Sequence, residues 1–239
     1  KGVMAYHAGN VERAERCFTE HIKTHYNHSD SYKHLLKIYE DTGKQESLLH
    51  ICETILELGE RNLSGVDLDK VRRSFADISY ENKSYEDALY HYLLLLDKAP
   101  SNELKKRTAF LYASQNHFGK ALNYYNEVIQ DSPLDYEAKT AVIPCLIGES
   151  ELDDAVKLLE ELKSHDMASN REIYMLAKIK HKQGLKEESN QYFVEFLEQS
   201  KWSARNSCKD ALDILFPRTF AVYPARGIII IAIKESFQF

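Results

Sequence analysis

The sequence repeats with a period of about 34 residues, and no other feature constrains the fold as strongly. Residues 85–100, YEDALYHYLLLLDKAP, and residues 118–133, FGKALNYYNEVIQDSP, share an alanine, a tyrosine four residues later and a final proline. Aligning on the small residue gives six copies, evenly spaced except for one longer step, with these anchors: Ala14, Leu48, Ala88, Ala121, Ala155 and Ser189. Such a period indicates a supersecondary unit that buries its apolar face against the next copy.

Each copy contains two stretches with helical periodicity and a turn between them. In the fourth copy, one helical face carries Leu104, Thr108 and Leu111, and the next carries Ala121, Leu122, Tyr125, Val128 and Ile129. Five residues before the anchors lie Gly9, Gly43, Lys83, Asn116, Ser150 and Gly184, three of them glycine. We interpret the small anchors as points where the second helix of a pair crosses the first closely. Ala88 and Ala121 should therefore be buried.

This pattern resembles the tetratricopeptide repeat (TPR), whose unit of about 34 residues is a pair of antiparallel helices. The resemblance covers about residues 1–200 and implies an all-α fold, a right-handed α-α superhelix of about six TPR units. A further amphipathic stripe follows the repeats and consists of Ala204, Cys208, Ala211, Leu212 and Leu215. This stripe predicts a capping helix over residues 201–217.

The last residues, 218–239, differ in character from the repeats. The segment RTFAVYPARGIIIIAIKESFQF is β-like, with a Pro-Ala-Arg-Gly turn before an isoleucine run. It predicts a short β-like tail, either as a hairpin or as a segment that docks on the last helices. Because such a stretch is prone to aggregation when exposed, we expect it to contact another surface, including another copy of the chain.

Two irregularities interrupt the period. The longer step, from Leu48 to Ala88, inserts six residues around GERNLSGVDLDK, residues 59–70, which predicts a longer helix end or a loop on the rim and a flexible joint. Pro144 falls inside the first helix of the fifth copy. Because proline removes a backbone hydrogen bond, it predicts a kink there.

Composition excludes several classes of function. The chain has 239 residues and a net charge of −6, with charges of both signs interleaved, so no basic block predicts nucleic acid as a partner. The longest apolar run, residues 227–233, is shorter than the roughly 20 residues of a membrane span. The four cysteines are far apart and indicate buried free thiols in a reducing compartment, hence a cytoplasmic location. The opening residues, KGVMAYHAGN, resemble the interior of a longer protein, so we expect chain upstream, where a signal or anchor would lie.

The residues that could carry catalysis are few. His21, His25 and His28 have the helical spacing of metal ligands, but no carboxylate or cysteine lies at a fitting distance along the chain, so we expect exposed histidines. The pairs Asp153-Asp154 and Glu187-Glu188 begin second helices, where negative charge stabilises the helix dipole. No phosphate-binding loop or nucleophile motif occurs. We therefore expect neither an enzyme nor a cofactor.

The TPR resemblance implies a concave groove lined by the first helix of each pair, which in this family receives peptides or partner helices. The positions implied to face it are Lys33, Lys37, Lys70, Arg73, Tyr80, Lys106, Phe110, Pro144, Ile147, Arg171, Tyr174 and Lys178. The row begins rich in basic residues and becomes apolar in its middle. This predicts a protein or peptide ligand with an acidic end and an apolar end. The alternative is that the charges are only solvated and the C-terminal tail covers the apolar residues.

The hypothesis favoured by these observations is a non-catalytic scaffold for protein–protein interaction. The chaperone-binding members of the family hold a carboxylate with lysine and asparagine, and the asparagines are missing here, so we argue against an Hsp70/Hsp90 co-chaperone. Residues 12–60 also resemble bacterial envelope-assembly TPR proteins, among them the lipopolysaccharide-assembly adaptor, whose pair of C-x-x-C motifs this chain lacks. Two alternatives stay open: a structural subunit that self-associates through its convex face or tail, and an accessory domain of an enzyme.

Overall fold

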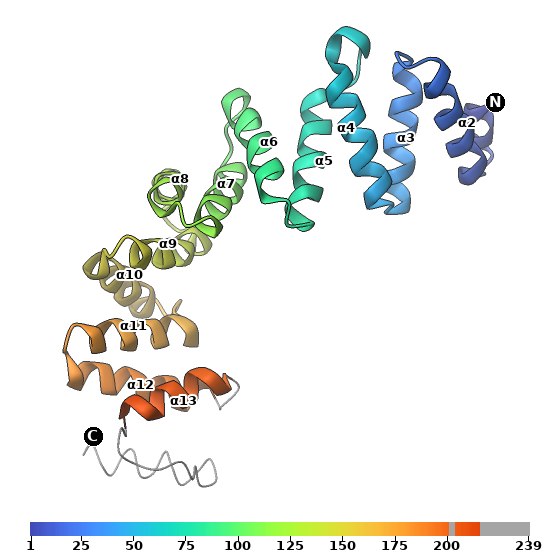
Figure 1. Ribbon diagram of the computed structural model, residues 1–239. Helices are drawn as coiled ribbons and strands as arrows, with labels where there is room; N and C mark the ends of the chain where they lie inside the picture. The colour runs from blue at the N-terminus through green and yellow to red at the C-terminus, as the bar shows by residue number, and fades with distance from the viewer. Residues whose placement is uncertain (201–203, 216–239) are drawn as a thin grey trace. The chain divides into compact units, whose positions relative to one another are not determined.

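The computed structural model describes residues 1–200 and 204–215, and within them it contains thirteen helices and no strand (Figure 1). The predicted all-α repeat fold is confirmed. The chain divides into two compact units, Lys1–Ser114 and Gln115–Phe239. We call them the first unit and the second unit. The predicted tail, residues 218–239, lies outside the described residues.

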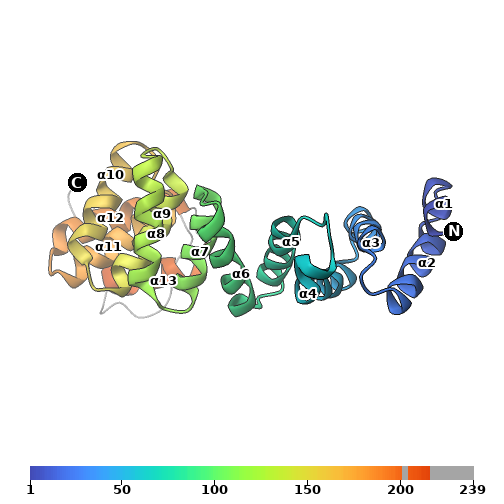
Figure 2. The same ribbon diagram turned by 90° about the horizontal axis from the view of Figure 1, so that it is seen from above.

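The first unit consists of three antiparallel helix pairs and the first helix of a fourth. Its helices are α1 (Gly2–His7), α2 (Val11–Thr24), α3 (Ser29–Thr42), α4 (Gln45–Asn62), α5 (Leu68–Glu81), α6 (Tyr85–Lys98) and α7 (Asn102–Ser114). Each helix packs on the next one along the chain. Figures 1 and 2 show α3, α4 and α5 side by side in that order.

The second unit continues the same alternation of first and second helices. Its helices are α8 (Phe118–Asp131), α9 (Tyr136–Gly148), α10 (Leu152–Ser164), α11 (Asn170–Lys182), α12 (Lys186–Ser200) and α13 (Arg205–Leu215). The last of these falls within the predicted capping segment and packs on α12. Cys208, Ala211, Leu212 and Leu215 of α13 are buried in one cluster with Phe193 and Leu197 of α12.

The six anchors are all buried, as the close crossing of paired helices requires. At Ser189 the crossing is close enough for the hydroxyl of α12 to donate a hydrogen bond of 3.0 Å to the carbonyl oxygen of Ala177 on α11. A second small residue lies twelve positions before three of the anchors, and it is fully buried in each case: Ala76, Ala109 and Ala177. A larger side chain at either position would hold the two helices of a pair apart.

The turn inside each pair explains the residues found five positions before the anchors. All six have a positive φ, between 61° and 80°, whether or not they are glycine. A left-handed conformation costs an ordinary L-residue roughly 1–2 kcal/mol, which glycine avoids. Lys83, Asn116 and Ser150 therefore adopt a backbone conformation that the other three copies leave to glycine.

The six inserted residues form both a longer helix and a loop. Helix α4 extends to Asn62 across a non-helical residue, Gly59, and Leu63 after it is fully buried in the core of the first unit. The loop then leads to Asp67, which caps α5. Helix α4 packs on α5 across the insertion, and the flexible joint stays a prediction.

Two further features bear on the sequence predictions. Helix α9 continues through Pro144 to Gly148, and Pro144 itself is half-buried. In the part of the chain that the structure describes, none of the helices combines the length and apolar character that crossing a bilayer would require.

Candidate ligand groove

The basic part of the predicted groove lies between α3 and α5. There the first helices of the second and third pairs border a cavity of about 410 Å³. We call it the lysine cavity; its lining includes Lys33, Lys37 and Lys70 together with Glu40, Asp41 and residues 65–67. Three of the predicted groove residues therefore meet in one hollow. The insertion supplies one of its walls, because residues 65–67 are the end of the inserted loop.

Each ammonium group of the lysine cavity has a weak contact with its surroundings. Lys33 Nζ lies 3.3 Å from a carboxylate oxygen of Asp30, and Lys70 Nζ lies 3.6 Å from Glu40 across the two helices. Lys37 Nζ lies 5.8 Å from the centre of the Tyr6 ring. Since ion pairs between exposed side chains stabilise a protein by about 1 kcal/mol or less, these lysines can exchange partners at small cost.

A polar network joins the first helices α5 and α7 through Tyr92 of α6. Tyr92 is fully buried and donates a hydrogen bond of 2.6 Å to Asp77. Arg107 on α7 donates to Asp77 at 2.9 Å and to the Tyr92 hydroxyl oxygen at 3.0 Å. Burial, and then the hydrogen bond to Asp77, raise the pKa of Tyr92, so its hydroxyl stays a donor at neutral pH.

The network supports an aromatic pair at the surface. The guanidinium carbon of Arg107 lies over the Tyr80 ring, 5.8 Å from the ring centre. Phe110 packs against the same ring, with the two ring centres 5.6 Å apart. Phe110 is 43% exposed, so part of its ring is open to solvent. The guanidinium therefore holds Tyr80 from one side, while Phe110 is left open to solvent.

The second unit carries the other predicted groove residues, and two of them are already occupied. The Tyr174 hydroxyl donates a hydrogen bond to the carboxylate of Asp210 on α13, and Lys178 Nζ lies 3.1 Å from the same carboxylate. The Tyr174 ring packs against Phe196, with ring centres 5.0 Å apart. The hydrogen bond from Tyr174 and then the charge of Lys178 hold the pKa of Asp210 below its usual value.

The remaining predicted residues are placed as follows. Arg73 and Lys106 are half-buried on α5 and α7, and Arg171 is exposed at the start of α11. Pro144 and Ile147 lie one turn apart on α9, both half-buried. Whether any of these twelve residues contacts a ligand stays a prediction.

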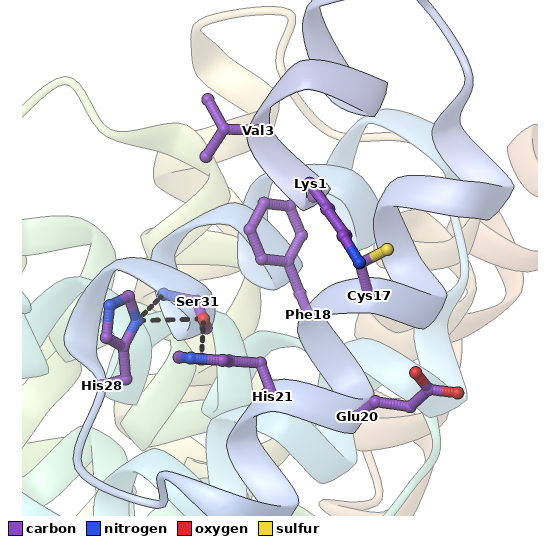
Figure 3. A pocket seen from close by; sticks show the side chains of 9 residues that line it. Lys1, Val3, Cys17, Phe18, Glu20, His21, His28 and Ser31 are labelled. Atoms are coloured by element: carbon purple, nitrogen blue, oxygen red, sulfur yellow. Dashed lines mark hydrogen bonds between the residues drawn. The ribbon is translucent and has the colours of Figure 1, made fainter.

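Two of the three histidines, His21 and His28, line a separate cavity of about 510 Å³, which is formed by residues 1–3, α2 and the start of α3. Figure 3 shows His21 and His28 turned toward Ser31, whose Oγ lies 3.1 Å from His21 Nδ1 and 3.0 Å from His28 Nδ1. His28 Nδ1 also accepts the Ser31 backbone N–H and so caps α3. Across residues 1–200 and 204–215, no three His, Cys, Asp or Glu side chains are arranged to hold a metal ion.

Cysteine reactivity is low where the thiols are buried. Cys52, Cys145 and Cys208 are buried free thiols, as the sequence predicted, whereas Cys17 is half-buried. Burial raises the pKa of the Cys52 thiol to about 12 and that of Cys145 to about 11. Because the thiolate is the nucleophile, these two side chains are unreactive at neutral pH.

Comparison with known proteins identifies the fold. No family model and no curated protein matches the sequence. Among solved structures, the C-terminal part of a TPR repeat-containing protein from Cytophaga hutchinsonii has a TM-score of 0.62 at 12% identity, covering 99% of this chain and 92% of that one. MamA, from residue 41 to its end, from Desulfovibrio magneticus RS-1 has a TM-score of 0.59 at 12% identity, covering 74% and 97%.

A third similar structure is YrrB, described as a TPR protein with an unusual peptide-binding site. Its TM-score is 0.57 at 16% identity, and the alignment covers 91% of this chain and 97% of YrrB. At identities this low the likeness is one of fold. The resemblance to TPR repeats seen in the sequence is thereby confirmed.

Sequence reasoning missed the residues that hold the groove positions in place. Asp210 follows its partner Lys178, and Arg107 follows its partner Asp77, by nearly one repeat in each case. A search for opposite charges 30 to 32 residues apart would have found both pairs.

Proposed function

We propose that this chain, which has the TPR fold, is a non-catalytic scaffold that binds a peptide or helix of a partner protein across α3, α5 and α7 of the first unit. The observation that carries the proposal is the exposed Phe110, packed on the half-buried Tyr80, on the same row of first helices as the lysine cavity. A protein of similar fold, YrrB, is described as having a peptide-binding site, which supports this class of ligand.

The physical roles divide along the row. Aromatic side chains at the centre of an interface contribute most of the affinity, because they bury a large rigid area at little entropic cost. Phe110 supplies such an area, and the Arg107 network keeps its neighbour Tyr80 in position. The lysines would steer an approaching segment and set its direction.

The second unit would contribute less to this ligand. Tyr174 and Lys178 are engaged by Asp210, so a ligand must displace α13 contacts before it reaches them. We propose Pro144, Ile147 and Arg171 as ligand contacts within the second unit, considered by itself.

The experiment is a selection of peptides from a random dodecapeptide display library on the full chain. Peptides selected on the wild type should bind Phe110→Ala at least about tenfold more weakly, a loss of about 1.4 kcal/mol. Tyr90→Ala is the matched control, because Tyr90 is an aromatic side chain with 61% exposure on α6, outside the row. Equal binding to wild type and Phe110→Ala would refute the groove.

A structural subunit that self-associates is the second candidate. It is favoured by two large apolar side chains outside the row, Met4 and Leu134, each 76% exposed. Sedimentation velocity over a hundredfold range of concentration separates the two candidates. A dimer that is lost in Met4→Ser or Leu134→Ser favours the second, whereas a monomer that binds selected peptides favours the first.

A further inference from the structure

The lysine cavity is a specific feature of one place in the array. The six inserted residues occur only between the second and third copies, and the end of the insertion walls the cavity. Gly65 in that wall has a φ of 70°, and a Cβ atom added there would lie 3.5 Å from Lys33 Nζ. The loop therefore lies directly against the lysine side chain.

The charges around the cavity are three ammonium groups and three carboxylates, but they are not equally available. Asp67 is committed to its own helix, because its carboxylate accepts the backbone N–H groups of Asp69 at 3.1 Å and Lys70 at 3.0 Å. Glu40 lies at the loose distance of 3.6 Å from Lys70. Lys33 pairs with Asp30, whose side chain is 72% exposed. The ammonium groups of Lys33 and Lys70 are held only by these exposed or loose ion pairs, so a ligand can reach them at little cost.

Lysine placement within the cavity favours one kind of ligand group. Lys33 and Lys37 are one turn apart on α3 and therefore share a face of that helix, while Lys70 stands on α5 across the cavity. A carboxylate in the cavity would gain a charge-assisted hydrogen bond from each ammonium group that turns to it. The three neighbouring carboxylates would repel a dianionic phosphate or a nucleic-acid backbone more strongly than a group of charge −1.

We infer that the lysine cavity binds an aspartate or glutamate side chain of the same segment that covers Phe110. The inference rests on the proposed function and adds a direction to it. Because α3, α5 and α7 follow one another in the row, the acidic residue lies at the α3–α5 end of the bound segment. An apolar residue lies at the α7 end.

The test uses the same dodecapeptide library on four proteins: wild type, the double variant Lys33→Glu with Lys37→Glu, Phe110→Ala, and a control. Lys157→Glu is a matched control, because Lys157 forms the same i,i+3 surface pair, with Asp154 at 2.7 Å, in the second unit. All four substituted positions are exposed, and unchanged thermal melting will show that the variants fold.

The expected result is enrichment of Asp and Glu among peptides selected on wild type and Lys157→Glu, separated from an apolar residue. On the double variant, those peptides should bind about tenfold more weakly, and new selections should favour Lys and Arg. Selected acidic peptides should also lose affinity as salt is raised.

Other outcomes overturn the inference in distinguishable ways. Peptides that depend on Phe110 but show no acidic preference would refute the lysine cavity as a carboxylate site and leave the proposed function standing. Phosphoserine peptides that bind more than tenfold tighter than their glutamate equivalents would reassign the cavity to a phosphorylated partner. A library that yields no specific peptide would refute both proposals.

Discussion

Each unit contains one ion pair at the same repeat position, and the two pairs have opposite polarity. Eleven positions before its anchor, the third copy has Asp77, in the first unit, and the sixth copy has Lys178, in the second unit. Each forms an ion pair with a later first helix, Asp77 with Arg107 at 2.9 Å and Lys178 with Asp210 at 3.1 Å. The polarity is reversed, but the geometry of the repeat is kept.

The consequences for a ligand differ between the units. In the first unit, Arg107 packs on Tyr80 and leaves Phe110 exposed. In the second, Asp210 binds both Tyr174 and Lys178, so that α13 occupies two of the predicted groove positions. The repeat position decides which neighbour a side chain meets, whereas the identity of that neighbour decides whether the side chain remains open. Four predictions test this contrast, the largest expected effect first.

Tyr92→Ala should destabilise the first unit by about 3–5 kcal/mol, because it removes a fully buried aromatic ring and its hydrogen bonds. Tyr92→Phe keeps the ring and should cost only about 1 kcal/mol. Urea unfolding followed by circular dichroism measures both. If Tyr92→Phe were as damaging as Tyr92→Ala, the polar network and not the packing would dominate the first unit.

Asp210→Ala should destabilise the second unit by about 1 kcal/mol, because the carboxylate that it removes is 42% exposed. It should also open Tyr174 to solvent, seen as a change in its NMR ring signals. Asp213→Ala is the control, since Asp213 is exposed on the same helix. Unaltered Tyr174 signals would show that α13 does not close this part of the groove.

Lys83→Gly in the first unit and Ser150→Gly in the second should each raise stability by about 0.5–1 kcal/mol, because the positive φ then costs less. Gly43→Ala and Gly184→Ala are the reverse changes. No atom lies within 4 Å of a Cβ added at either glycine, so their loss of about 1 kcal/mol would come from the backbone alone. The midpoint of urea unfolding measures each change. If the midpoint shifted for the substitutions in only one of the two units, the turns of the two units would not be equivalent.

The smallest expected effect is a loss of folding stability at acidic pH. Burial and then the charges of His28 and His25 lower the pKa of His21, and burial and then Arg72 lower that of His91, both in the first unit. The unfolded chain then binds more protons near pH 6 than the folded one, so the stability contributed by these groups is complete above about pH 6.5 and is lost as the pH falls. His21→Gln with His91→Gln should flatten the stability curve between pH 7.5 and 5.5; an unchanged slope would contradict this origin.

Several parts of the structure lay beyond reasoning from periodicity. The buried Lys180 places its Nζ 2.9 Å from a carboxylate oxygen of Glu160 and 2.8 Å from one of Glu188. The buried Lys139 places its Nζ 2.6 Å from a carboxylate oxygen of Glu161. A lysine in a repeat is expected at the surface, because burying its charge is costly without a partner. The partners come from the second helices α10 and α12, and only the packing of helices brings them to the lysines.

The sequence by itself determined the period, the anchors and the turns, because these depend on side-chain size and backbone conformation within a single repeat. Ala88 and Lys83 could be assigned their roles from spacing alone. Only the tertiary structure decided which of the predicted groove positions are open and that the insertion walls the lysine cavity. Those features depend on contacts between helices about one repeat apart, where charge and exposure are set by neighbours that no local pattern specifies.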